Sequence, residues 1–300
     1  MSSIEVSVIV LTYNHEDFIV SALESVEEQD FLNIQVVIGD DASDDSTCAL
    51  IEFFEKKSRL KFDKIFSNEN RGITKNFNAC LSRCTGEIIF LLGGDDIFLP
   101  GKISAQVKHM LNDPSISISY HDVEVFDSES DRTLYYYNNV HGRQEGGASV
   151  LVERGAFNCG CSVAVRNRNL PMCDERIKFA SDWLWYIEIL MSGGGDIKYL
   201  DGVFARYRRH GNNITGSAYL NQQYQEVMLS LNIIKEKYPS LATGVTQAES
   251  ERIFAFFIKF LVLHDYKKAF YLLRQALSVN ILSPFVFFRI RVRRILKIFR

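Results

Sequence analysis

The stretch that decides the fold is Glu87-Ile88-Ile89-Phe90-Leu91-Leu92-Gly93-Gly94-Asp95-Asp96. Its first six residues predict a buried strand, because nearly every position is apolar. Two adjacent carboxylates at the end of such a strand are costly unless a cation satisfies them. The two glycines leave room for a ligand to approach the backbone. A divalent metal that carries a phosphate group fits both properties, although this stretch alone leaves a solvated turn open as the alternative.

Strand and helix patterns alternate through the first 120 residues. Runs of apolar and β-branched residues predict strands, and apolar residues at helical spacing predict the helices between them. The strands are expected at 6–11, 36–38, 64–67 and 87–92, and the helices at 18–26, 47–54 and 74–84. This alternation predicts an α/β domain with a mostly parallel central sheet flanked by helices. Sheets of this kind bind their ligands at the carboxyl ends of the strands.

The pattern loosens beyond residue 120. Residues 121–147 are polar and aromatic, and they predict loops with short edge strands. A strand at 162–165, a helix at 182–191 and a strand at 197–200 follow, and the chain from Leu220 onward is predicted to be helical. We therefore expect a catalytic and ligand-binding domain over residues 1–219 and a helical C-terminal region over residues 220–300.

The charge is distributed unevenly along the chain. The net charge of -3 combines -12 over residues 1–250 with +9 over residues 251–300. Residues 284–300 predict a basic amphipathic helix that suits an anionic membrane surface. The alternative is a helix packed on the catalytic domain or on a second subunit, which leaves a homo-oligomer open. Nucleic acid is a poorer partner, because the rest of the chain is acidic and carries no nucleic-acid-binding motif.

The six cysteines include no C-x-x-C pair and no spacing typical of zinc sites, so reduced thiols are expected. The first residues lack the basic region of a signal peptide, and no uncharged apolar run reaches about 18 residues. These features predict a cytoplasmic protein without a transmembrane helix.

Three predicted strands end in polar residues, which are Thr12-Tyr13-Asn14-His15, Asp40-Asp41-Ala42-Ser43 and the Gly-Gly-Asp-Asp segment. A dinucleotide would need glycines in the first strand-to-helix turn, which has none, and the chain has no P-loop motif. A carboxylate after the second strand can accept a hydrogen bond from a base imide, and Tyr13 can lie beside that base. Carboxylates after the fourth strand can hold a metal with a diphosphate. The three strand ends together predict a site for a substituted nucleoside diphosphate.

Three segments, Val8–Asn14, Gly39–Thr47 and Thr85–Leu91 followed by Asp95-Asp96, resemble the signature of family 2 glycosyltransferases. The resemblance covers roughly residues 4–113 well and extends more patchily to about 215. It implies the A-type nucleotide-sugar-binding fold, a nucleotide-sugar donor with a UDP-sugar favoured, Mn²⁺ or Mg²⁺ as cofactor, and inverting transfer.

The resemblance also implies roles for single residues. Asp182, at the start of a later helix, would be the catalytic base, and its alternative role is an acid that complements the helix dipole. The metal would be held by Asp96, with His210 as a further ligand. Relatives commonly carry a third acid at the position of Gly93. The donor nucleotide would contact Thr12, Tyr13, Asn14, Asp40, Asp41, Lys75, Asn78 and Asp95.

These expectations describe a metal-dependent hexosyl- or glycosyltransferase of class EC 2.4 that assembles a bacterial surface polysaccharide such as O-antigen, capsule or exopolysaccharide. A basic tail on the membrane would suit a lipid-linked glycan acceptor on the cytoplasmic leaflet. A sugar nucleotidyltransferase is the first alternative, and the absence of a glycine- and lysine-rich first loop disfavours it. A non-catalytic sugar-nucleotide-binding or scaffolding relative is the second, supported only by Gly93 in place of the acid.

Overall fold

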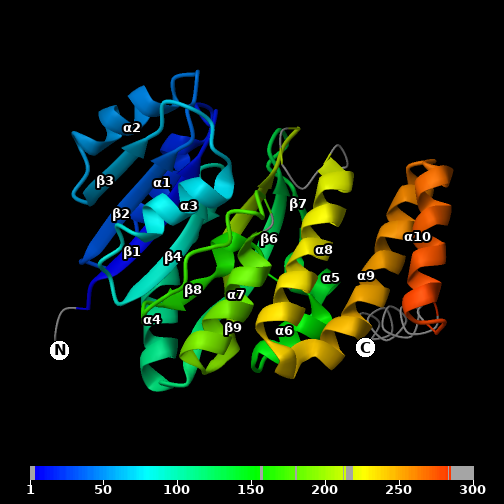
Figure 1. The fold of residues 1–300 in the computed structure, drawn as a ribbon. Coiled ribbons are helices and arrows are strands. Elements are labelled where there is room, and N and C mark those ends of the chain that lie inside the picture. The colour runs from blue at the N-terminus through cyan, green and yellow to red at the C-terminus, as the bar shows by residue number, and fades with distance from the viewer. Residues whose placement is uncertain are drawn as a thin grey trace. The chain divides into compact units, whose positions relative to one another are not determined.

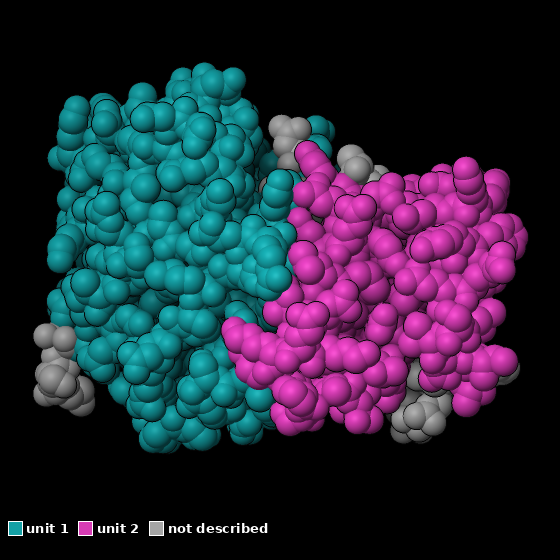
Figure 2. Space-filling model, in the orientation of Figure 1, with its two compact units in different colours: residues 1–147, 157–213 teal, residues 148–156, 214–300 magenta. Residues whose placement is uncertain are grey.

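The computed structural model describes residues 4–155, 158–179, 181–211, 213, 219–282 and 284. The chain divides into two compact units, unit 1 with residues 1–147 and 157–213 and unit 2 with residues 148–156 and 214–300 (Figure 2). The domain boundary expected after residue 219 stays a prediction. The basic tail expected at 284–300 lies outside the described residues except for Pro284.

Unit 1 is built on one sheet with the strand order β3-β2-β1-β4-β8-β6-β9-β5, with β7 paired to β6 (Figure 1). Strands β3, β2, β1 and β4 are parallel, and β8 lies antiparallel between β4 and β6. Strands β6 and β9 are parallel, and β5 pairs antiparallel with β9. The strands are β1 (Val6–Thr12), β2 (Ile34–Asp40), β3 (Lys61–Phe66), β4 (Ile88–Gly93), β5 (Ile97–Phe98), β6 (Ile116–Asp127), β7 (Thr133–Tyr136), β8 (Ala164–Arg166) and β9 (Asp196–Arg209).

Helices pack on the buried strands because successive side chains point to opposite faces of the sheet. Val6, Val8 and Val10 share one apolar core with side chains of α1 and α4, whereas α3 packs against β1 and β2 at Gly39. The helices of unit 1 are α1 (Ile19–Glu27), α2 (Thr47–Glu55), α3 (Ile73–Leu81), α4 (Lys102–Asn112), α5 (Tyr137–His141), α7 (Ser181–Gly193) and the 3₁₀ turn η1 (Gly160–Ser162). The predicted α/β fold is confirmed, with a sheet that is mixed as a whole.

The prediction of loops and short edge strands over residues 121–147 is wrong for its first part. Strand β6 runs from Ile116 to Asp127 and lies inside the sheet between β8 and β9. The polar residues of β6 indicated a loop, but they form hydrogen bonds inside the protein and are therefore tolerated in a buried strand. The side-chain amide of Gln106 donates to the carbonyl of Ser119 at 3.1 Å, and His121 Nε2 lies 2.9 Å from Lys102 Nζ.

Unit 2 is helical, as expected for the C-terminal region. It contains α6 (Ala148–Arg154), α8 (Leu220–Lys237), η3 (Pro239–Leu241), α9 (Ala242–Val262) and α10 (Tyr266–Val279). Apolar side chains of α8, α9 and α10, including Leu220, Phe256 and Leu272, form its core. Within the described ranges, no helix combines the length and the apolar character needed to cross a membrane.

Candidate functional site

The carboxyl ends of β1, β2 and β4 lie side by side in unit 1. Thr12 pairs in register with Asp40, and Leu11 pairs with Gly93. The backbone N–H of Asp41 donates to the carbonyl of Thr12 at 3.1 Å. The three polar strand ends expected from the sequence therefore meet at one edge of the sheet, which we call the strand-end site.

The carboxylates after β2 are buried, and the chain's own donors bind them. Asp40 accepts hydrogen bonds from the Ser43 backbone N–H at 2.8 Å and from the Ser43 hydroxyl at 2.5 Å. Asp41 accepts from the backbone N–H groups of Arg71 and Gly72, both at 2.8 Å. Each carboxylate oxygen has two lone pairs, so these bonds order the surrounding loops and leave acceptor capacity for a ligand.

The residues after β1 differ in how exposed they are. Thr12 is buried, and its hydroxyl has no hydrogen-bond partner in the part of the chain that the structure describes. Tyr13 is 46% exposed, as a ring that lies beside a ligand would be. Asn14 adopts a left-handed backbone conformation with φ of 53° and joins two loops, since its N–H donates to the Ser43 hydroxyl and its side chain accepts from the Asp44 N–H.

His15 lies in the first polar strand end, but the sequence assigned it no role in the site. A Cβ added to Gly94 would lie 2.8 Å from His15 Nδ1 and 2.9 Å from Thr12 Oγ1. The His15 and Thr12 side chains therefore occupy the space that a larger residue at position 94 would need. Within the described ranges His15 Nδ1 has no hydrogen-bond partner. Burial lowers the pKa of His15, so the neutral imidazole is favoured. Its place directly after the Thr-Tyr-Asn stretch was the available signal.

Asp95 faces His210 across the rim of the site. His210 Nε2 lies 3.0 Å from Asp95 Oδ2, and the two side chains are 11% and 16% exposed. Burial alone would raise the pKa of Asp95, but the hydrogen bond with His210 and the electrostatic interactions with His15 and His210 bring that pKa below its ordinary value. The sequence led us to expect Asp96 and His210 at the metal; in the structure the acid that contacts His210 is Asp95, and the metal-binding roles stay predictions.

Asp96 is turned inward from the same segment. Its Oδ1 accepts the Arg208 backbone N–H at 3.0 Å, while Arg208 Nε donates to the Asp95 carbonyl at 2.8 Å. Burial and the neighbouring Asp95 charge raise the pKa of Asp96 well above its ordinary value, although the Arg208 N–H and the Cys161 thiol bind the carboxylate. A cation nearby would favour the ionised form of this buried acid.

The donor set fits a cation that a substrate helps to bind. Among the described residues, no three His, Cys, Asp or Glu side chains lie close enough to hold a metal by themselves. Asp95 and His210 supply two adjacent donors, and Mg²⁺-type ions in proteins often take one or two carboxylates together with substrate phosphates. A Cβ at Gly93 would lie 2.5 Å from Asp95 Oδ1, so the Asp95 carboxylate occupies the space beside the position of the relatives' third acid.

Asp182 lies in the first turn of α7, directly after Ser181, and is half-buried. Its Oδ1 accepts the Trp183 backbone N–H at 2.8 Å, as an acid at a helix N-terminus does. Burial raises the pKa of Asp182. Burial also raises the pKa of the Cys159 thiol, and the charges of Asp96 and Asp182 both add to that effect. Asp182 and Asp96 therefore both interact electrostatically with the Cys159 thiol.

The two donor-binding residues expected on α3 have different surroundings. Lys75 is exposed, and its contact with a ligand stays a prediction. Asn78 binds the backbone of Cys173 twice, donating to its carbonyl at 2.9 Å and accepting from its N–H at 2.8 Å. Asn78 thus anchors the loop before α7, and its contact with a nucleotide stays a prediction.

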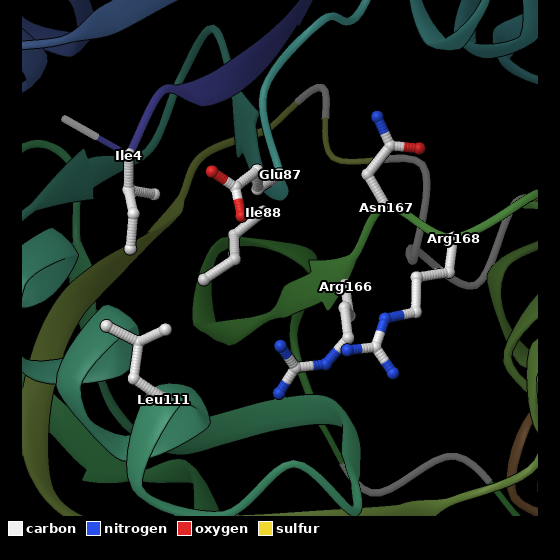
Figure 3. Close-up of a pocket in the computed structure, with 7 residues that line it drawn as sticks. All are labelled: Ile4, Glu87, Ile88, Leu111, Arg166, Asn167 and Arg168. Carbon is white, nitrogen blue, oxygen red and sulfur yellow. The ribbon is translucent and has the colours of Figure 1, made fainter. Parts of the chain in front are cut away.

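A pocket of about 90 Å³ lies at the opposite, amino-terminal end of β4 (Figure 3). Its volume is below the roughly 300–1,000 Å³ of typical small-molecule sites. The Arg166 guanidinium at its wall donates to the carbonyls of Met110 at 2.7 Å and Ile116 at 3.0 Å, so it holds the end of α4. The lining residues are Ile4, Glu87, Ile88, Leu111, Arg166, Asn167 and Arg168. The polar side chains of the strand-end site make it a better candidate for the functional site than this small pocket.

Curated relatives share much of unit 1. An uncharacterized protein of Mycobacterium tuberculosis is 29% identical over 219 residues, which cover 72% of this chain and 62% of the relative. The chain thus spans less than two thirds of the length of that relative. The Escherichia coli protein WfgD, a UDP-Glc:α-D-GlcNAc-diphosphoundecaprenol β-1,3-glucosyltransferase, is 26% identical over 220 residues, 71% of this chain and 81% of the relative.

Solved structures share the fold. Staphylococcus aureus TarS residues 1–349 in complex with UDP-GlcNAc superposes with a TM-score of 0.67 at 19% identity, covering 92% of this chain and 81% of that one. The mannosyltransferase PcManGT of Pyrobaculum calidifontis in complex with GDP-Man and Mn²⁺ gives a TM-score of 0.60 at 17% identity, with coverage of 99% and 86%.

The family model described as Glycosyl transferase family 2 matches residues 7–170, more than half of the chain. The matched range includes all three polar strand ends and the segment with Asp95 and Asp96. This chain belongs to glycosyl transferase family 2.

Proposed function

We propose that this chain is an inverting, metal-dependent glycosyltransferase. It moves a sugar from a nucleotide-diphosphate-sugar, with a UDP-sugar favoured, to a hydroxyl of a lipid-linked glycan during assembly of a bacterial surface polysaccharide. WfgD, whose name includes a UDP-sugar donor and a diphosphoundecaprenol acceptor, supports the donor and acceptor classes. An acceptor of this class would place the enzyme on the cytoplasmic face of the membrane.

The observation that carries the proposal is the pair Asp95 and His210 at the strand-end site, with Nε2 and Oδ2 3.0 Å apart. Asp95 follows β4, which pairs directly with β1, and β2 lies on the other side of β1. A diphosphate held at Asp95 would extend its nucleoside across the end of β1 toward Thr12 and Asp41. The Thr12 hydroxyl, which has no partner among the described residues, and the spare lone pairs of Asp41 suit the polar edge of a base.

Mn²⁺ or Mg²⁺ would be held by Asp95 and His210, with Asp96 behind them, and would neutralise charge on the leaving diphosphate. The bound Mn²⁺ in the structurally similar PcManGT supports this cofactor class. Arg208 lies against the same segment through its bond to the Asp95 carbonyl, and its guanidinium charge lowers the local negative potential.

Asp182 would act as the general base. Its pKa is raised by burial, which brings it closer to the pH at which a carboxylate accepts a proton efficiently. It would take the proton from the acceptor hydroxyl as that oxygen attacks the anomeric carbon from the side opposite the diphosphate. The direct displacement inverts the anomeric centre and needs no carboxylate nucleophile.

The test measures UDP binding by calorimetry and UDP release from UDP-sugars, each with and without Mn²⁺. Asp95→Asn is expected to weaken Mn²⁺-dependent UDP binding by about tenfold or more, because a charge-assisted contact is lost. Asp182→Asn is expected to keep UDP affinity while transfer falls by roughly 10²–10⁴-fold, the usual contribution of a general base.

Asp201→Asn is the matched control, because that β9 carboxylate is 83% exposed and its ion pair with Arg143 lies on the surface. Its binding and turnover should match the wild type. Failure of every nucleotide diphosphate to bind with Mn²⁺ would refute the proposal. Donor binding without turnover in the wild type would instead favour the non-catalytic relative suggested by Gly93.

A further inference from the structure

The outer surface of α10 carries large apolar side chains in solvent. Phe270 and Tyr271 are 61% and 60% exposed, although smaller α10 residues such as Ala269 and Leu272 are buried in the core of unit 2. Scattered exposed apolar residues are ordinary, but a contiguous group marks an interaction surface. We call this group the α10 surface; its apolar members, which helical spacing places along one side of α10, are Tyr266, Phe270, Tyr271 and Leu277.

Cations share the α10 surface with these apolar groups. Lys267, Phe270, Arg274 and Leu277 follow one another at spacings of three and four residues, so they lie along one stripe of the helix. Both cations are exposed. The sole acid between residues 252 and 282 is Asp265, which is used as the N-cap of α10 and accepts the Lys268 backbone N–H.

A second copy of the chain is a poor occupant of this surface. A symmetric dimer would bring the same patch of both copies together, so Lys267 and Arg274 would face the cations of the partner with few acids to pair them. Lysine is also depleted at protein interfaces. An anionic lipid surface, in contrast, matches both the positive charge and the exposed aromatic rings, which favour the boundary between water and lipid.

We propose that the α10 surface binds an anionic lipid bilayer, with Phe270 and Tyr271 entering the headgroup region and Lys267 and Arg274 contacting lipid phosphates. Only the role of this lipid binding rests on the proposed function: it would hold unit 1 near a lipid-linked acceptor. The residues involved are separate from the strand-end site, and they are also separate from the basic segment 285–300.

The test is co-sedimentation of the full 300-residue chain with vesicles of phosphatidylcholine alone or with 30% phosphatidylglycerol. The chain is expected to partition onto the anionic vesicles and to be released by salt. Lys267→Gln with Arg274→Gln should lower the partition coefficient roughly 25-fold, about fivefold for each basic residue removed. Phe270→Ser with Tyr271→Ser should lower it by about tenfold or more. All four side chains are exposed, so the variants should fold.

Leu32→Ser in unit 1 is the matched control, since Leu32 is 87% exposed but lies outside the α10 surface, and its partition should equal that of the wild type. Wild-type partition by both double variants would overturn the inference and assign any lipid binding to another segment. Conversion of an oligomer to monomers by the variants, measured by sedimentation velocity without vesicles, would overturn it in favour of a second copy. UDP binding with Mn²⁺ is measured in the same samples, so a failed donor site and a failed lipid surface give different results.

Discussion

Replacement of Gly94 by alanine tests the packing of the strand-end site directly. A Cβ at this position would lie 2.8 Å from His15 Nδ1, 2.9 Å from Thr12 Oγ1 and 3.0 Å from Thr12 Cβ. Favourable contacts between such atoms lie at about 3.5–4.0 Å, so each contact is short by about 0.5 Å or more.

The neighbours of Gly94 have little freedom to move. Thr12 is β-branched, which restricts its χ1 angle, and it is buried at the end of a strand paired on both sides. Overpacking in such a place typically destabilises a protein by about 1–3 kcal/mol. For a unit of roughly 200 residues this corresponds to a fall in Tm of about 2–12 °C. Donor binding should weaken as well, because Thr12 and His15 are displaced within the site.

Thermal unfolding of Gly94→Ala, followed by circular dichroism, gives the measurement. Gly193→Ala is the control, since its Cβ meets no heavy atom within 4 Å. That substitution lies in the last turn of α7, where alanine adds up to about 1 kcal/mol of helix propensity. Equal Tm values for Gly94→Ala and the wild type would show that the strand ends are not packed as described.

Two further predictions concern buried titratable groups. Burial lowers the pKa of Lys102 to about 7, whereas the unfolded lysine titrates near 10.4, so the unfolded state binds more protons above pH 7 and stability should rise with pH by up to about 1.4 kcal/mol per unit. In urea unfolding at pH 7, 7.5 and 8, Lys102→Met should lack this rise relative to the wild type; parallel curves would contradict the buried-amine assignment. The raised pKa of Asp182 predicts that the active, ionised base is lost as pH falls through a value above the ordinary 3.9 or so, giving an acid limb in kcat/KM for UDP release. That limb should disappear from the residual activity of Asp182→Asn, and its persistence would assign it to another group.

Strands β1, β2 and β4 could be predicted from the sequence because they are largely buried, and burial leaves a nearly continuous apolar run. Val8, Val36 and Phe90 illustrate this pattern. The edge strand β3 is only partly buried and gave a weaker pattern. Strand β6 could not be predicted in the same way. The polarity of His121 indicated a loop, although its side chain is buried and contacts Lys102 in the interior. Local pattern does not reveal which polar side chains find partners far along the chain.

The strand-end acids of the candidate site were predictable because each follows an apolar run. Their orientations were not. Asp95 and Asp96 are neighbours in sequence, yet one faces His210 and the other accepts the Arg208 N–H. The different orientations of the two acids depend on contacts with β9 and the residue after it, which are more than 100 residues away in the sequence. Apart from its place after the Thr-Tyr-Asn stretch, His15 gave no signal, because its spatial neighbours Gly94 and His210 are distant in sequence.

The two-residue strand β5 limits how the chain length at the strand-end site can vary. Ile97 pairs with Arg206 and Phe98 with Ala205, immediately after the acidic pair and shortly before His210. A one-residue insertion or deletion at this junction would slip the pairing and send alternate side chains to the other face of the sheet. The imidazole of His210 would then lose its contact with the Asp95 carboxylate although no polar residue had been replaced. We therefore expect an insertion between Asp96 and Ile97 to disturb the strand-end site as much as the loss of a charged side chain does, and engineered loop grafts should preserve this junction.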